Sequence, residues 1–139
     1  MKIMAVDYGD AHTGVAISDR TGTLCGFSTV VTAYRPEVVA GQLQKLAAEH
    51  EVTELVLGHP INMDGSRGVR AEKAEAFAET LRAATGLPVT LWDERRTTVD
   101  AHNILAANGK RAKERKKTVD AVAASLMLEG YLTYKKRNG

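Results

Sequence analysis

The sequence predicts an α/β protein built on a mixed β-sheet, and three observations lead to this prediction. Three short apolar runs separated by turns occupy residues 1–33 and indicate an antiparallel meander. From residue 36 onward, segments with apolar residues at helical spacing alternate with short apolar runs, which is typical of parallel strands joined by helices. The length of 139 residues suits one core, so residues 1–139 are expected to form one domain.

The elements follow in order along the chain. Strands are expected at 2–6, 14–19, 24–33, 55–58 and 89–92, and helices at 36–50, 69–85, 97–108 and 118–134. Pro36 suits the first turn of a helix, while Gly86 and Gly109 are typical helix ends. A basic loop is expected at 110–117, and a short basic tail at about 133–139.

The composition excludes several classes of protein. Hydrophobic residues make up 44% and charged residues 26% of the chain, which is ordinary for a soluble globular protein. Cys25 is the only cysteine, so an intrachain disulfide is excluded. No segment approaches the ~20 apolar residues of a membrane helix, and the opening stretch lacks the apolar core of a signal peptide. We therefore expect a cytoplasmic protein without a membrane partner.

Two candidate acidic sites, and also the Gly58-His59-Pro60 loop, lie where predicted strands end, which is where α/β sheets gather their ligands. Asp7 follows the first strand and precedes a turn with Gly9, so it could hold a metal ion or could cap the turn. Asp93 and Glu94 end the last strand and precede Arg95. One of these acids could face a metal while the arginine binds a phosphate, or the group could be a surface salt bridge beside a helix cap.

A third candidate is Asp120, near the start of the last helix. An acid there is favoured by the helix dipole, but the small residues after it could also let the helix pack closely on the sheet and direct Asp120 toward Asp7. The cations before Asp120 are expected to contact the phosphate backbone of a nucleic acid. This interpretation is favoured over the alternative that they form only a solvated loop. These cations are Lys110, Arg111, Lys113, Arg115, Lys116 and Lys117. The four histidines are scattered and lack zinc-site spacing.

Four motifs in this order resemble the YqgF family, also called RuvX, of Holliday junction resolvases and pre-16S rRNA nucleases. The resemblance runs from residue 1 to about residue 132. Its motifs are Asp7-Tyr8-Gly9 with Gly14-Val15-Ala16, Leu57-Gly58-His59-Pro60 with Asp64-Gly65, Asp93-Glu94-Arg95 with Thr97-Thr98, and Asp120-Ala121-Val122-Ala123-Ala124 behind the lysines. Each motif is modest alone, whereas four in the right order are specific.

The resemblance implies a ribonuclease H-like fold, with a five-stranded mixed sheet whose first three strands are antiparallel and with flanking helices. It also implies a nuclease site with Mg²⁺ or Mn²⁺, two ions in number, held by Asp7, Glu94 and Asp120, with Asp93 as the alternative second ligand. Nucleic-acid contacts are expected from Arg95, Lys113, Arg115, Lys116 and Lys117. This sequence departs from the family pattern at His12 and Thr13, where an arginine and an aliphatic residue are usual.

Three functions remain open at this point. The first is an endonuclease that processes the 5′ end of pre-16S rRNA, or resolves branched DNA as a possible homodimer. The second is a nucleic-acid-binding module without catalytic activity. The third, an actin-like ATPase suggested by the glycine spacing after Asp7, would need two large lobes, for which 139 residues are too few.

Overall fold

The fold is a five-stranded mixed β-sheet with helices on both faces. The computed structural model describes residues 2–22, 25–62, 64–93 and 112–138, and it describes side chains from Asp120 to Arg137 in the last stretch. The strands are β1 (Lys2–Asp7), β2 (His12–Ser18), β3 (Cys25–Thr32), β4 (Val52–His59) and β5 (Val89–Asp93). Their spatial order is β3-β2-β1-β4-β5, with the first three antiparallel and β4 and β5 parallel to β1. The predicted sheet is confirmed.

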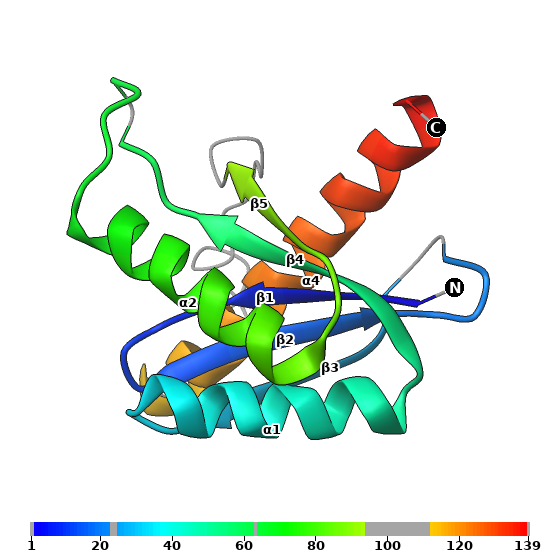
Figure 1. The fold of residues 1–139 in the computed structure, drawn as a ribbon, viewed down its shortest axis with the longest axis horizontal. Helices are drawn as coiled ribbons and strands as arrows, with labels where there is room; N and C mark the ends of the chain where they lie inside the picture. Colours follow the sequence, from blue (N-terminus) through cyan, green and yellow to red (C-terminus); the bar gives the residue numbers. More distant parts are fainter. Residues whose placement is uncertain (1, 23–24, 63, 94–111, 139) are drawn as a thin grey trace.

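The helices divide between the two faces of this sheet (Figure 1). Helices α1 (Pro36–Glu49) and α2 (Val69–Thr85) pack together on one face, and α4 (Ala112–Asn138) crosses β1, β2 and β3 on the other. Gly86 ends α2 in a left-handed conformation with φ of 69°. Among the described helices, none is both long and apolar enough to cross a membrane.

Side-chain alternation in β1 assigns each residue near the strand end to one face. Met4 and Val6 pack in the core under α1 and α2, while Ile3 and Ala5 pack in the core under α4. Because successive side chains of a strand point to opposite faces, Asp7 is directed toward the α4 face. The predicted metal ligand on β1 therefore points toward the helix that carries Asp120.

The structure corrects the predicted basic loop and basic tail. Helix α4 begins at Ala112 and continues to Asn138, so residues 112–117 and 133–138 are helical. Both segments are rich in lysine and arginine, which are strong helix formers, and charge alone does not end a helix. The predicted helix at 97–108 lies outside the described residues, whereas the predicted helix at 69–85 coincides with α2.

Gly14 of β2 is the point where α4 comes closest to the sheet. A Cβ atom built on Gly14 would lie 2.0 Å from the carbonyl oxygen of Asp120, which is far closer than two such atoms can approach. Gly14 is also the cross-strand partner of Asp7. The absence of a side chain at Gly14 therefore permits α4 to rest directly on the backbone of β2.

Replacing Gly14 by alanine should separate α4 from the sheet. We expect Gly14→Ala to lower the free energy of unfolding by roughly 1–3 kcal/mol, because backbone atoms of α4 must move to admit the methyl group. Gly41→Ala is the matched control, since Gly41 lies in α1 and a Cβ there meets nothing within 4 Å. It should stabilise by about 0.5–1 kcal/mol through helix propensity. Urea unfolding of both variants measures the difference, and equal stability of the two would contradict the proposed contact.

Candidate active site

Asp7 and Asp120 come together across Gly14, although they belong to opposite ends of the chain. Asp7 is the last residue of β1, and its cross-strand partner Gly14 contacts the backbone of Asp120 in α4. Both aspartates are partly buried. The structure therefore brings two of the three predicted metal ligands to one place on the α4 face.

The alternation of side chains along β5 gives the direction of Asp93. Trp92 packs in the core under α4, so Asp93 is directed to the opposite face. His59, the neighbour of Asp93 across the parallel pair, also faces that side, where its ring contacts Glu75 of α2. Asp93 therefore faces away from Asp7. Glu94 and Arg95 lie outside the described residues, and among the described ones no three acidic, histidine or cysteine side chains form a metal-binding group.

The predicted cations precede Asp120 on the same helix. The backbone of Lys113, Arg115, Lys116 and Lys117 belongs to the first turns of α4, and their side chains lie outside the described residues. The structure therefore places these residues on a helix that leads directly to Asp120, instead of on a loop. Their contact with nucleic acid stays a prediction.

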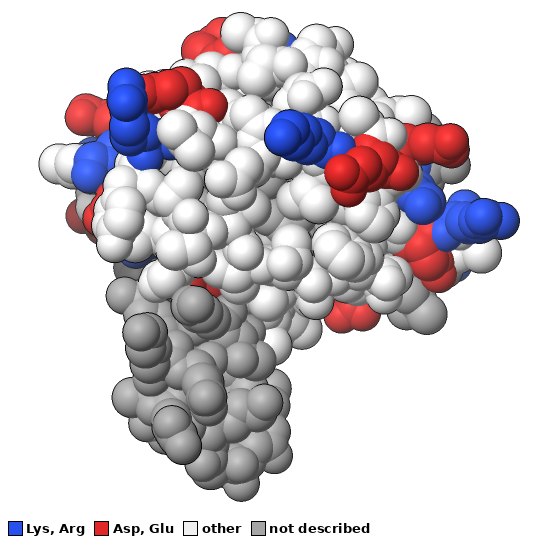
Figure 2. Space-filling model, turned by 90° about the horizontal axis from the view of Figure 1, so that it is seen from below, with Lys and Arg blue, Asp and Glu red and all other residues white. Residues whose placement is uncertain are grey.

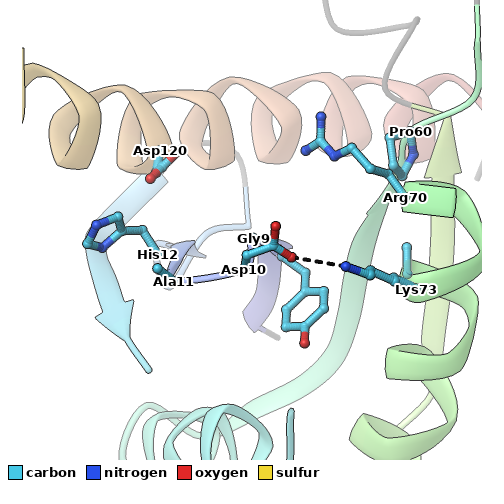
Figure 3. Close-up of a pocket in the computed structure, with 10 residues that line it drawn as sticks. Gly9, Asp10, Ala11, His12, Pro60, Arg70, Lys73 and Asp120 are labelled. Atoms are coloured by element: carbon cyan, nitrogen blue, oxygen red, sulfur yellow. Dashed lines mark hydrogen bonds and ion pairs between the residues drawn. The ribbon is translucent and has the colours of Figure 1, made fainter. Parts of the chain in front are cut away.

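A pocket of about 260 Å³ lies beside Asp120 (Figure 3). Asp120 and His12 line one side of it, and α2 supplies Arg70 and Lys73 on the other. Between them is the β1–β2 turn, where Asp10 pairs with Lys73 at 3.4 Å between Oδ1 and Nζ. The remaining lining residues are Tyr8, Gly9, Ala11, Pro60 and Ala74.

The sequence prediction missed Arg70 and Lys73. A signal for them was present, because Arg70, Lys73, Ala74 and Phe77 are spaced i, i+3, i+4 and i+7 and therefore share one face of α2. Ala74 and Phe77 are buried, so this face is the one that packs on the sheet. At its first turns the same face extends past the sheet and carries the two cations into the pocket.

The two residues that depart from the family pattern have different surroundings. Thr13 is fully buried, and its hydroxyl accepts a hydrogen bond of 3.5 Å from the backbone N–H of Gly9, which closes the β1–β2 turn. His12 lines the pocket, and its Nδ1 lies 3.4 Å from the hydroxyl of Thr32 on β3. Thr13 therefore supports the turn, whereas His12 is available to the site.

The β4–α2 loop is held at both ends by one carboxylate. Oε2 of Glu75 in α2 accepts a hydrogen bond of 2.7 Å from Nε of Arg67 and lies 2.7 Å from Nε2 of His59. The Arg67 guanidinium, followed by the His59 ring, holds the pKa of the Glu75 carboxyl below its usual range. This ionic contact fixes the loop that contributes Pro60 to the pocket.

The fold matches two solved structures of RuvC. RuvC of T. thermophilus, solved in complex with a Holliday junction substrate, superimposes with a TM-score of 0.65 over 97% of this chain and 96% of RuvC, at 15% sequence identity. A second structure of Thermus thermophilus RuvC matches with a TM-score of 0.55 at 14% identity. The sheet order and the helix packing thus define the ribonuclease H-like class of α/β proteins.

Sequence comparison identifies the family within this class. The family model RuvX, described as Holliday junction resolvase, matches residues 1–134, so the chain belongs to the RuvX family and is a nuclease. A relative from Halothermothrix orenii is 42% identical over 137 residues, which cover 99% of this chain and 98% of the relative. A relative from Myxococcus xanthus is 46% identical over 135 residues, covering 95% and 87%. Both carry the name "Putative pre-16S rRNA nuclease".

The contact of Glu75 with the loop should depend on pH. Because folding lowers the pKa of this carboxyl, its stabilisation is present above the unfolded value of 4.5 and is lost as the pH falls through the lowered value. Glu75→Gln should therefore melt below wild type at pH 7, and the gap should close as the pH falls below 4.5. Glu49→Gln, at an exposed position of α1, is the control that should change melting little. A gap that persists unchanged into acid would contradict the ionic contact.

Proposed function

We propose that the chain is a metal-dependent endonuclease that processes the 5′ end of pre-16S rRNA. The observation that carries the proposal is the meeting of Asp7 and Asp120 across Gly14. The substrate is suggested by the names of relatives that match over nearly their whole length. Hydrolysis of a phosphodiester bond at such a site needs no covalent intermediate with the protein.

The residues present fit a divalent metal. Asp7 and Asp120 offer carboxylate oxygens, the donors that Mg²⁺ and Mn²⁺ prefer, from the end of β1 and from α4, which rests on the cross-strand partner of Asp7. Two Mg²⁺ or Mn²⁺ ions would activate a water molecule and stabilise the leaving oxygen when bound. We assign Glu94 as the third ligand, because the alternation of β5 turns Asp93 away from Asp7.

The chain's own residues would bind and orient the substrate around these acids. Arg95 would bind a phosphate through its planar guanidinium, and the cations of α4 would neutralise neighbouring phosphates. These α4 residues are Lys113, Arg115, Lys116 and Lys117. The turn that Thr13 and Gly9 close would hold His12 beside the substrate.

Removing one carboxylate should abolish cleavage without unfolding the protein. We expect Asp7→Asn and Asp120→Asn to lower the cleavage rate of precursor 16S rRNA by about 100-fold or more in Mg²⁺ or Mn²⁺, because the oxygen donors lose their charge. Asp19→Asn is the matched control. Asp19 follows the end of β2 that is remote from Gly14, and its Oδ1 accepts a hydrogen bond of 2.7 Å from the Thr21 hydroxyl. Chelation by EDTA should stop the wild-type reaction. Equal cleavage by wild type and both variants would refute the assigned site, and binding without any cleavage would favour an inactive binding module.

The two adjacent acids of the third position can be separated in the same assay. Glu94→Gln should lower the cleavage rate by about 100-fold or more, as expected for a metal ligand. Asp93→Asn should lower it much less, because β5 directs Asp93 toward the α2 face. Isothermal titration with Mn²⁺ gives a readout that does not depend on activity. If Asp93→Asn lowered the cleavage rate more than Glu94→Gln, Asp93 and not Glu94 would be the third ligand.

Resolution of branched DNA is the second candidate, favoured by the description of the RuvX family. A four-way DNA junction offered beside precursor 16S rRNA distinguishes the two substrates. Symmetric cutting of both junction strands would require two copies of the chain, so the junction complex would contain a homodimer. For an rRNA-processing nuclease we expect faster cleavage of the rRNA precursor by a single copy.

A further inference from the structure

The pocket beside Asp120 has a cationic wall that the carboxylate site does not account for. Arg70 and Lys73 both line it, and both are exposed to solvent on the first turns of α2. Asp120 and His12 lie across the pocket from them (Figure 3). A strand of nucleic acid that reaches Asp120 through this pocket would pass both cations.

The position of this wall relative to the acids is set by core packing. Phe77, one turn after Lys73 on the same face of α2, stacks on Tyr8 with ring centroids 4.0 Å apart and planes at 4°. Tyr8 directly follows Asp7. The aromatic stack therefore joins α2 to the end of β1 close to the first predicted ligand. The two cations therefore stand on a helix whose packing places it beside the end of β1.

The side chains themselves suit phosphate. The guanidinium of Arg70 is a planar fork that can donate two hydrogen bonds to one phosphate, and the ammonium of Lys73 supplies a compact charge. Lys73 pairs with Asp10 at 3.4 Å, but 56% of the lysine side chain and 88% of the aspartate side chain are exposed. Ion pairs this exposed are weak, so a phosphate can replace Asp10 as the partner of Lys73.

Two other cations of the described surface have a different setting. Arg35 bonds its near neighbour Glu37, and Arg82 bonds Glu79 one turn away, so each is matched by an acid on its own segment. Figure 2 shows the α1 side of the molecule, where lysines and arginines stand in small groups mixed with acids over a largely uncharged surface. That side offers no continuous path for a polyanion among the described residues, whereas the pocket leads to a carboxylate site.

We propose that Arg70 and Lys73 bind backbone phosphates of the cleaved strand next to the scissile bond, so that the strand runs between α2 and α4. The inference rests on the proposed function and adds to it a second binding surface, on α2, besides the cations predicted to bind from α4. In the absence of nucleic acid, Asp10 is the ion-pair partner of Lys73, and it competes with the phosphate for this lysine. The site recognises the backbone, so its contribution is independent of base sequence.

The test measures binding of a labelled RNA fragment that spans the 5′ end of precursor 16S rRNA, in EDTA and at several salt concentrations. Arg70→Gln and Lys73→Gln together should raise Kd about tenfold or more and reduce the salt dependence by roughly one unit for each phosphate that is no longer bound. In Mg²⁺ the double variant should lose kcat/KM more than kcat. Lys45→Gln, which removes one positive charge at an exposed position on α1, is the control for a general charge effect and should leave Kd unchanged.

Asp10→Asn separates phosphate binding from a merely structural ion pair. If Asp10 competes with phosphate for Lys73, its neutralisation should tighten RNA binding, opposite to the effect of Lys73→Gln. If the pair only supports the turn, both variants should weaken binding together and lower the melting temperature, which would overturn the inference.

The remaining outcomes separate this inference from the proposed function. In one outcome the wild-type chain binds and cleaves the RNA, and the double variant has the same Kd and salt dependence as wild type. This outcome overturns the inference alone. A wild-type chain that neither binds nor cleaves nucleic acid overturns the proposed function and this inference with it. Circular dichroism melting of each variant verifies that the fold is intact.

Discussion

The architecture depends on the direct contact between the backbone of Gly14 in β2 and the backbone of Asp120 in α4. A side chain at Gly14 would occupy the space of the Asp120 carbonyl group, so this close approach of helix and sheet requires glycine. The same residue is the cross-strand partner of Asp7. One missing side chain thus lets α4 lie directly on β2 beside the end of β1. The close packing of α4 and the position of the Asp120 backbone therefore depend on the same glycine.

Helix α2 has an equally central role on the other side of the sheet. Phe77 joins it to the end of β1 through the stack with Tyr8, and Glu75 joins it to the β4–α2 loop through Arg67 and His59. Both contacts lie near strand ends that border the pocket. Because α2 is held at these points, its first turns can present charged side chains to the pocket without a mobile loop. The rigidity of the site therefore comes from the elements around it.

Most of the fold could be predicted because its signals are local. Apolar runs bounded by turns predict the three antiparallel strands, and the richness in alanine and glutamate with the terminal Gly86 predicts α2 to the residue. The predicted start of α4 is wrong for a physical reason. The charge run before residue 118 suggests a loop, but lysine, arginine and alanine favour helix, and the cooperativity of α4 extends it to Ala112. Composition indicates solvent exposure there and says little about backbone conformation.

The sequence by itself determined which residues could do chemistry. Asp7, Asp93, Glu94 and Asp120 are recognisable because acids at strand ends and near a cationic run are unusual, and the order of motifs indicates the family. Tertiary structure alone decided which of them meet. Strand alternation turns Asp7 toward α4 and Asp93 away from it, and the packing of α2 brings Arg70 and Lys73 to the pocket. The order of residues along the chain does not state which side chains meet, because these meetings arise only when helices cover the two faces of one sheet.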